Sequence, residues 1–533
     1  NLVAVGDSSL YSNGANSTLI YHATKNTGLG SKTLFSNTNG YSNTAMGYNA
    51  LYSNETGYSN TANGNEALYK NTTGKSNTAT GNESLYSNTT GNSNASYGEK
   101  VLYTNTTGSS NTATGNEALF SNISGNANTV CGFQAVYENV IGNNNTAMGY
   151  EALRHNLGGN SNIAIGVNAL WLNQNRSNLV AVGDSSLYSN GANSTLSYHA
   201  TKNTAIGSKA LYSNTNGYSN TATGYKALYT NETGSSNTAN GCEALQENTT
   251  GYSNTAGGQQ SLRTNTTGYQ NTAIGREALQ TNSSGNNNSA VGFHSLNSNS
   301  SGTGNTGIGY NALYSNVDGE YNSALGYTAF STGGSFQNST ALGYDAEPGA
   351  SNTIRLGNSS ISSIGGYANW TNVSDERFKK NVSENVIGVE FIRLLRPVTY
   401  QLDMDAIASY YKTPDSLRLE ESERMKEAEI QNGFIAQEVE QAAIEVGYDF
   451  HGVDKPKNST SSYGLRYAEF VVPLVKAVQE QQTMIEKLQE QNKEIDELKT
   501  IITSQKELIK KQSDILLEMK SMIENMKESG SVE

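Results

Sequence analysis

The chain has 533 residues, which is more than one compact core usually holds, so several domains are expected. Only 35% of the residues are hydrophobic, 54 are glycine, and the formal net charge is −13, which argues against a nucleic-acid partner. No apolar run is long enough to span a membrane, and the two distant cysteines, Cys131 and Cys242, predict neither a disulfide framework nor a metal site. No cofactor is expected.

A glycine recurs every 17 residues from Gly30 to Gly183 and from Gly207 to Gly343, and with Gly6 it marks 20 copies of one repeat. The consensus reads SNTAxGxxALYxNTTGx. Seventeen residues are too few for two packed helices, and the Asn-Thr-Thr-Gly and Asn-Thr-Ala-x-Gly segments are turn formers. Residues 1–343 are therefore predicted to form a mainly β solenoid, a parallel β-roll of 17-residue coils. Asn1 falls inside a repeat, which indicates a mature or truncated chain.

Stacked coils would place equivalent side chains above one another at about 4.8 Å spacing. The repeated asparagines are then expected to form hydrogen-bonded ladders. Ala45, Gly47 and Leu51, with their equivalents, are predicted to form a thin interior row. The tyrosines that follow the leucine position, such as Tyr52 and Tyr69, are expected to stack along the surface. Because so thin a core buries little apolar surface, oligomerisation is expected.

Two inserted loops interrupt the repeat. The steps from Gly6 to Gly30 and from Gly183 to Gly207 are 24 residues long, seven more than the period, and residues 1–57 recur as residues 178–234 with few differences. This pattern indicates a tandem duplication. The loops carry a Tyr-His pair each: Tyr21 and His22 in the first, Tyr198 and His199 in the second. They are interpreted either as loop filler or as ligand-contacting protrusions, since loops on rigid scaffolds commonly carry binding sites.

The N-S-x-A-x-G-like core of the repeat resembles the head repeats of YadA-like trimeric adhesins, over residues 1–343. The resemblance implies a left-handed parallel β-roll and a homotrimer. The repeat length of 17 departs from the commonest length in those heads, which leaves the number of strands per coil open.

The character of the chain changes after Gly343. Residues 344–373 are predicted to be a neck or junction. Residues 374–533 hold 21 Lys and Arg and 30 Asp and Glu, against 13 and 17 in the longer segment before them. Four segments in this part form a recognisable series: Ser374–Asn381 (SDERFKKN), Leu395–Tyr400 (LRPVTY), Gly433–Val439 (GFIAQEV) and Tyr467–Ala477 (YAEFVVPLVKA).

This series resembles the peptidase S74 family, the intramolecular chaperone domain of phage tail fibres and tailspikes, whose pattern begins S-D-x-R-x-K. The resemblance implies that residues 374–533 trimerise, guide the upstream fibre into register, and cleave themselves off just before the serine. That serine corresponds to Ser374, so the predicted cleavage site lies between Val373 and Ser374.

A serine hydroxyl is a weak nucleophile and needs a base. His451 is the only histidine in residues 374–533 and no Ser-His-Asp arrangement is apparent, but a neutral lysine can replace histidine. We therefore expect an autoproteolytic Ser-Lys peptidase in which Ser374 attacks and Lys379 is the base. The rival base and the candidate supporting residues are Lys380, Asp375 and Arg377. The alternative interpretation is that Ser374 merely N-caps a helix.

The end of the chain is predicted to be a coiled coil over about residues 474–527. The heptad places isoleucine or leucine at its a positions: Leu488, Ile495, Ile502, Ile509, Leu516 and Ile523. The d positions mix apolar and polar residues: Met484, Leu498, Met519 and Met526 with Gln491, Gln505 and Gln512. This pattern favours more than two strands.

The predicted function is therefore a trimeric fibre or adhesin subunit outside the cell, as a virion tail fibre or as a fibre of a bacterial surface or injection apparatus. It would attach to a receptor on a host cell or another surface, for example a glycan. One alternative is a purely structural shaft. A glycan-degrading tailspike is a weaker alternative, because it needs paired carboxylates and acidic residues are sparse in the repeats.

Overall fold

The computed structural model describes residues 1–15, 17, 19–192, 194–332, 334–458 and 461–530. The chain divides into two units, Asn1–Asn358 and Ser359–Glu533, and each is treated by itself.

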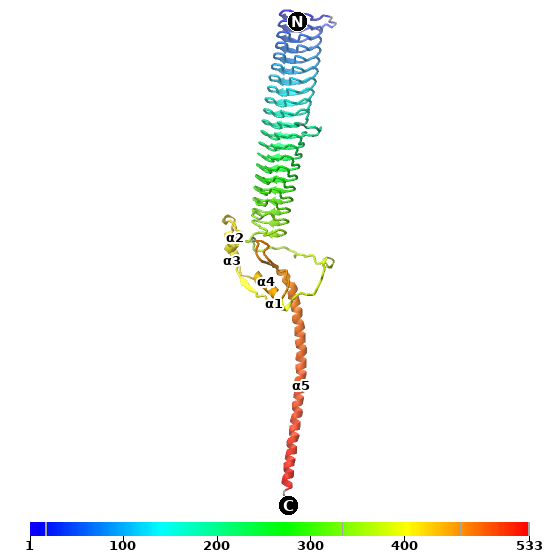
Figure 1. The fold of residues 1–533 in the computed structure, drawn as a ribbon. Helices are drawn as coiled ribbons and strands as arrows, with labels where there is room; N and C mark the ends of the chain where they lie inside the picture. Colours follow the sequence, from blue (N-terminus) through cyan, green and yellow to red (C-terminus); the bar gives the residue numbers. More distant parts are fainter. Residues whose placement is uncertain (16, 18, 193, 333, 459–460, 531–533) are drawn as a thin grey trace. The chain divides into compact units, whose positions relative to one another are not determined.

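The first unit is a β-solenoid, as predicted (Figure 1). Each coil contributes one three-residue strand to a single parallel sheet of 21 strands. Each strand pairs with the next along the chain, so that Thr44, Ala45 and Met46 face Thr61, Ala62 and Asn63. The strands are β1 (Val3–Val5), β2 (Thr27–Leu29), β3 (Thr44–Met46), β4 (Thr61–Asn63), β5 (Thr78–Thr80), β6 (Ala95–Tyr97), β7 (Thr112–Thr114), β8 (Thr129–Cys131), β9 (Thr146–Met148), β10 (Ile163–Ile165), β11 (Val180–Val182), β12 (Thr204–Ile206), β13 (Thr221–Thr223), β14 (Thr238–Asn240), β15 (Thr255–Gly257), β16 (Thr272–Ile274), β17 (Ser289–Val291), β18 (Thr306–Ile308), β19 (Ser323–Leu325), β20 (Thr340–Leu342) and β21 (Ile354–Leu356).

The two insertions leave the sheet register unchanged. Val3 pairs with Thr27 and Val180 with Thr204, each across a 24-residue step. The seven extra residues therefore leave the coil as loops, which project from the side of the solenoid in Figure 1. Beyond Gly343 the sheet gains one more strand, β21, which pairs with β20.

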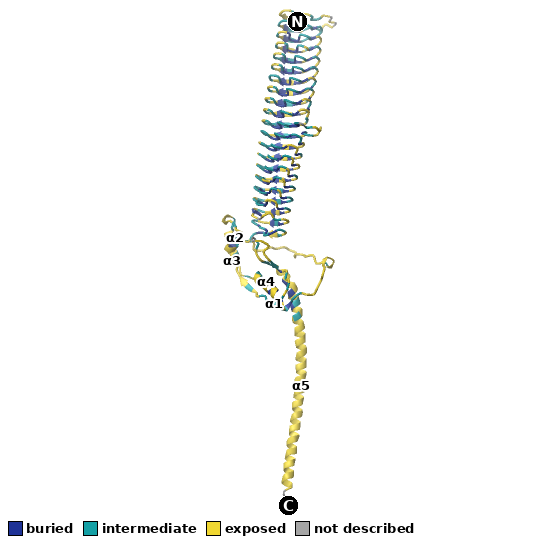
Figure 2. Cartoon of the chain, viewed as in Figure 1, coloured by how far each residue is buried: buried dark blue, intermediate teal, exposed yellow. Residues whose placement is uncertain are grey.

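The interior of the solenoid is a narrow row of small and medium apolar side chains. Ala45, Ala50 and Leu51 are fully buried, and their equivalents continue the row through the array (Figure 2). The prediction for Gly47 was wrong, because this residue is half-buried at the coil corner. Its φ is 122°, and a Cβ there would lie 2.4 Å from the carbonyl oxygen of Gly64. Glycine is therefore needed for the close approach of successive coils and contributes little to the core.

Two asparagine ladders run along the interior, as predicted. In one, the Nδ2 of Asn60 donates to Oδ1 of Asn43 at 3.2 Å. In the other, the Nδ2 of Asn71 donates to Oδ1 of Asn54 at 2.8 Å. Both amides also donate to Gly74 O, at 2.8 and 3.0 Å. Each buried amide thus donates to an asparagine of the preceding coil and to a turn carbonyl, so the ladders fix the coil conformation.

Replacing one rung is expected to loosen its coil. Asn122 donates to Asn105 Oδ1 at 2.7 Å and to Gly125 O at 3.0 Å. Asn122→Ala leaves these buried acceptors short of a donor and should destabilise the local coils by about 2–3 kcal/mol. Amide hydrogen exchange over residues 105–142 should rise. Asn116→Ala is the control, since Asn116 donates only at the surface, to Glu99. Equal protection in the two variants would contradict a structural role for the ladder.

Aromatic residues stack along the outside, as predicted. The rings of Tyr52, Tyr69, Tyr86 and Tyr103 are near-parallel, with centroids 5.1 to 5.2 Å apart. Each ring covers its neighbour in the next coil, so the stack adds to coil–coil cohesion.

The second unit is α+β and ends in a long helix. Its helices are α1 (Val389–Ile392), α2 (Met404–Tyr411), α3 (Glu420–Ala428), α4 (Ala436–Glu445) and α5 (Val471–Ser529). Its strands are β22 (Val398–Tyr400), β23 (Gln431–Gly433), β24 (Val453–Asp454) and β25 (Gly464–Leu465). Short 3₁₀ helices lie at Glu376–Phe378, Asp415–Leu417 and Tyr467–Phe470. Both strand pairs are antiparallel.

The core of this unit is small. Phe391, Val439 and Phe470 are buried at its centre, with Ala442 and Ala443 beside them. Helix α5 has 59 residues, and its buried residues, Pro473 and Ala477, lie near its start (Figure 2). The remainder of α5 is exposed, and its apolar side chains are not buried by the described residues of this unit.

Candidate functional site

The segment that begins at Ser374 brings a serine and a lysine together. The Nζ of Lys379 donates to Oγ of Ser374 at 2.9 Å. Of the two candidate lysines, Lys379 is thus the one whose amine contacts the hydroxyl. Lys379 follows the 3₁₀ helix Glu376–Phe378 and has an extended backbone (φ −99°, ψ 135°), in which successive side chains alternate in direction.

Asp375 and Arg377 hold the turn between these two residues. Oδ1 of Asp375 accepts from the Arg377 backbone N at 2.9 Å, which makes Asp375 the N-cap of the 3₁₀ helix. The alternative that Ser374 caps a helix is therefore wrong. The Arg377 guanidinium also donates to both carboxylate oxygens of Asp375, with the shortest distance 2.6 Å. These hydrogen bonds lower the pKa of Asp375.

The serine–lysine pair is open to solvent in the single chain. Ser374 and Lys379 are exposed, and Val373, which precedes the predicted scissile bond, is 83% exposed. Lys380 is exposed as well. Among the residues that the structure describes, residues 374–379 form their hydrogen bonds only with one another. The residues on both sides of the Val373–Ser374 peptide bond are therefore exposed to solvent.

The other three sequence segments of the series meet one another in the fold. Strand β22 of the second segment pairs with β23 at the start of the third, with Val398 opposite Gly433. Arg396 and Glu438, from the same two segments, form a two-pronged ion pair with distances of 3.0 and 2.5 Å. The ion pair lowers the pKa of Glu438. These contacts fix α4 beside the paired strands β22 and β23.

The third and fourth segments meet at an aromatic contact. The hydroxyl of Tyr467 accepts from the Phe434 backbone N at 3.1 Å, and the rings of Phe434 and Phe470 stack at 5.3 Å. A Cβ at Gly433 would lie 2.2 Å from the Tyr467 hydroxyl, so this close contact requires glycine. Three of the four sequence segments therefore meet in one small core, although they lie far apart in the sequence.

One contact of this core was not predicted. Oε2 of Glu480 accepts from the Val389 backbone N at 2.8 Å and so ties α1 to α5. A Cβ at Gly388 would lie 2.5 Å from the same oxygen. Nothing in the sequence distinguishes Glu480 from the other glutamates of the helix, since its partner is a backbone amide 91 residues away.

The Tyr-His pairs of the inserted loops divide between two environments. Tyr21 and Tyr198 are exposed, whereas His22 and His199 are half-buried. In both loops the tyrosine ring lies edge-on to its histidine, with centroids 5.0 and 4.7 Å apart. The structure thus exposes the tyrosines of the two loops to solvent more than the histidines.

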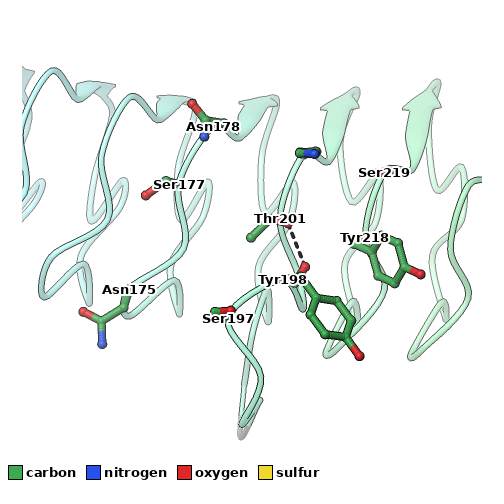
Figure 3. A pocket seen from close by; sticks show the side chains of 9 residues that line it. Asn175, Ser177, Asn178, Ser197, Tyr198, Thr201, Tyr218 and Ser219 are labelled. Carbon is green, nitrogen blue, oxygen red and sulfur yellow. Dashed lines mark hydrogen bonds between the residues drawn. The ribbon is translucent and has the colours of Figure 1, made fainter.

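A cavity of about 560 Å³ lies beside the second loop (Figure 3). The rings of Tyr198 and Tyr218 meet there at 5.6 Å and nearly at right angles. Thr201 Oγ1 donates to the Tyr198 carbonyl at 2.7 Å, which fixes the base of the loop. The other residues of the lining are polar: Asn175, Ser177, Asn178, Ser197, Lys202 and Ser219. His199 is not part of the lining.

Arg176 anchors the loop that forms this cavity. Its guanidinium donates to the carbonyls of Ser194 at 2.8 Å and Leu196 at 3.0 Å. Burial lowers the pKa of Arg176. The sequence carries a signal for this residue, because the eight coils before it place glycine at this position, from Gly40 to Gly159. The substitution comes just before the insertion that Arg176 contacts.

Other kinds of site are not found in the described residues. Cys131 and Cys242 are free and exposed. Within the described ranges, no cluster of three or more His, Cys, Asp or Glu is placed to hold a metal ion. No helix in the part of the chain that the structure describes has the length and apolar character needed to cross a membrane.

Comparison with known proteins agrees with the geometry of the second unit. Residues 374–448 match the family model of peptidase S74, described as the chaperone of endosialidase. The match begins at the serine of the serine–lysine pair and includes the antiparallel strands β22 and β23 and helix α4. No curated protein matches the chain. Near its C-terminus, then, the chain carries a chaperone-of-endosialidase domain of the peptidase S74 type, preceded by a β-solenoid.

Proposed function

We propose that the chain is one subunit of a trimeric fibre that attaches to a cell or another surface, and that Ser374–Glu533 is its self-cleaving assembly chaperone. The observation that carries the proposal is the contact of Lys379 with Ser374 at the first residue of the S74 match. The β-solenoid before it supplies an elongated fibre body. S74 domains are typical of phage tail fibres and tailspikes, which suggests an extracellular virion fibre.

The proposed cleavage needs only residues of this chain and water. Neutral Lys379 takes the proton of the Ser374 hydroxyl along the 2.9 Å contact, and Oγ attacks the carbonyl carbon of Val373. The Val373–Ser374 C–N bond breaks as the amine nitrogen receives that proton, which leaves an ester on Oγ. Water then hydrolyses the ester. The products are a chain that ends in the Val373 carboxylate and a chain that begins with the Ser374 amine.

Assembly would prepare this site for chemistry. A base must be neutral, and a lysine loses its proton more readily when water is excluded. Because Ser374 and Lys379 are exposed in the single chain, partner subunits must supply the cover. Cleavage would therefore follow trimerisation, which is the order that a chaperone requires.

The C-terminal helix supports association. The apolar residues at the predicted heptad a positions of α5 are between 46% (Ile495) and 66% (Leu516) exposed. An apolar seam on a long isolated helix needs partner helices to cover it. We infer that three copies of α5 form a coiled coil.

The direct test is the mass and stoichiometry of refolded wild-type protein. Sedimentation should show a trimer, and intact mass analysis should give two products that divide between Val373 and Ser374. A full-length monomer after prolonged refolding would contradict the proposal.

The cavity beside Tyr198 favours a glycan as the attachment ligand. An exposed tyrosine face can stack on the apolar face of a sugar, while the Asn178 amide, the Ser219 hydroxyl and the Lys202 amine can bond to its hydroxyls. The same cavity argues against the purely structural shaft.

Tyr198→Ala is expected to lower the affinity of the cleaved trimer at least tenfold for the glycans that bind the wild type in an array screen. The substitution removes the aromatic face on which the sugar would stack. Tyr252→Ala is the matched control. Tyr252 is similarly exposed, at 44% against 53%, and is not part of this cavity. Equal loss in both variants, or no glycan bound by the wild type, would favour the structural shaft.

A further inference from the structure

The outward side of the solenoid sheet carries an uncharged column of side chains. We define the outer column as the third residue of each strand from β1 to β21. The middle residue of each strand from β2 to β20 is buried, as Ala45 is, so the third residue of these strands points out, whereas the terminal strands β1 and β21 have exposed middle residues. None of the 21 column residues is Asp, Glu, Lys or Arg. Three residues further along the coil, charges recur, for example at Glu66, Lys100 and Glu117.

The outer column contains two long apolar runs. From β16 to β21 it reads Ile, Val, Ile, Leu, Leu, Leu, and each of these residues is the direct register partner of the next. From β8 to β12 it reads Cys, Met, Ile, Val, Ile. The three strands between these runs place Thr223, Asn240 and Gly257 in the column.

Most of the apolar column side chains are large and far from buried. The exposed fractions of these large side chains run from 37% at Ile165 to 54% at Val5, while Val182 and Leu356 are half-buried. Single exposed apolar residues are ordinary, but a contiguous exposed patch marks an interaction surface. At roughly 80 Å² per side chain, the two runs expose on the order of 800 Å², which is the area that a specific interface buries on each partner.

We propose that the outer column is the surface through which copies of this chain pack against one another, facing the axis of the fibre. This inference rests on the proposed trimer and adds which face forms it. The partner must be uncharged over its whole length, since the column offers no counter-charge. Its side chains must also recur at the rise of one coil to interdigitate. A parallel copy of the same solenoid meets both requirements, whereas a folded protein of another kind or a lipid surface has no such period.

Cys131 provides a probe of this packing, because it is free, exposed and the column residue of β8. In a trimer with the column at its axis, the three Cys131 thiols lie at one level. A disulfide needs Cα atoms within about 7 Å. In a Cys242→Ser background, mild oxidation with diamide should therefore produce a covalent dimer on a non-reducing gel, with about two-thirds of the chains cross-linked because one disulfide joins two of three subunits.

The matched control moves the thiol off the column. Cys131→Ser combined with Ile123→Cys places it on a turn of a neighbouring coil, where the native side chain is 45% exposed. This variant should give at least tenfold less covalent dimer. Equal cross-linking at both positions, or a trimer in solution without cross-linking through Cys131, would overturn the face assignment and leave the trimer intact. A monomeric chain would instead overturn the proposed function.

A charge on the column gives a second test. Ile308→Glu would set three carboxylates against one another at the axis, and the trimer fraction after refolding should fall at least tenfold. Asn311→Glu is the control, three residues away and in the position that Glu277 occupies two coils earlier. Asn311 and Glu277 both have left-handed backbone, with φ of 53° and 58°. Because glutamate already occupies this conformation at position 277, the coil should accept glutamate at position 311. Equal loss of trimer in the two variants would contradict the proposal.

Discussion

Ser374→Ala is expected to keep the chain at its full 533 residues under conditions in which the wild type divides into residues 1–373 and 374–533. The variant lacks the hydroxyl that would attack Val373. Lys379→Ala should have the same effect, because it removes the amine that contacts this hydroxyl at 2.9 Å. We expect a fall in the cleavage rate of at least about 10³-fold for each, as is usual when a nucleophile or its base is lost. N-terminal sequencing of the released fragment and a time course on denaturing gels measure both.

Lys380→Ala is the matched control for the base. Lys380 is the neighbouring lysine and is equally exposed, so its loss changes the local charge in the same way. This variant should cleave at the wild-type rate. If Lys380→Ala stops cleavage and Lys379→Ala does not, the base is Lys380. Ser374→Ala must still form trimers, since a variant that fails to assemble would lose cleavage for a different reason.

Deletion of Ser374–Glu533 from the gene is expected to give aggregates, whereas removal of the same residues after folding should leave a trimer resistant to heat and detergent. The reason lies in the repeats. Equivalent coils present the same inward alanines, leucines and asparagines, so their local contacts do not choose a register between chains. Slipped trimers would leave strand ends exposed and would aggregate. A C-terminal trimerisation domain sets one starting register. Once it has been removed, an unfolded fibre cannot refold, so the lifetime of the fibre depends on its rate of unfolding.

The comparison requires one matched pair of samples. The first is residues 1–373 expressed alone, and the second is the same residues released by wild-type cleavage. Yield of soluble trimer, measured by light scattering after chromatography, should differ at least tenfold. Equal yields would reject the chaperone hypothesis even if cleavage at Ser374 were demonstrated.

The outer column bears on the same experiment. In an in-register trimer each column residue meets its own equivalent, so apolar strands meet apolar strands. A slip by one coil still sets apolar residues against apolar residues inside the two runs and mismatches them at the ends of the runs, for instance where Ile274 would meet Gly257. Few mismatches carry little free energy, and the column alone would reject a one-coil slip weakly. A slip of three coils would set Ile274, Val291 and Ile308 against Thr223, Asn240 and Gly257 of a neighbouring chain and would be rejected more strongly.

The sequence by itself determined the repeating part of the fold. A 17-residue period with asparagine, alanine and leucine at fixed places predicted stacked coils, buried amide ladders and stacked tyrosines, because each of these contacts joins residues one period apart. The series of four segments likewise predicted the S74 domain. The role of Gly47 was misread, since an interior glycine and a corner glycine give the same pattern, and only the φ of 122° and the nearness of Gly64 distinguish them.

Only the tertiary structure decided the contacts that have no period. That the amine of Lys379, and not that of Lys380, contacts the Ser374 hydroxyl depends on a 3₁₀ turn followed by extended backbone, which sends adjacent side chains in opposite directions. Tyr198 lines a cavity and His199 does not, in a loop whose Ser194 and Leu196 carbonyls accept hydrogen bonds from Arg176 in the coil before. Glu480 reaches the amide of Val389 only after α1 packs on α5. The Glu480 contact joins residues 91 positions apart, and the Lys379 contact depends on the backbone conformation of the residues between it and Ser374, so the order of residues alone specifies neither.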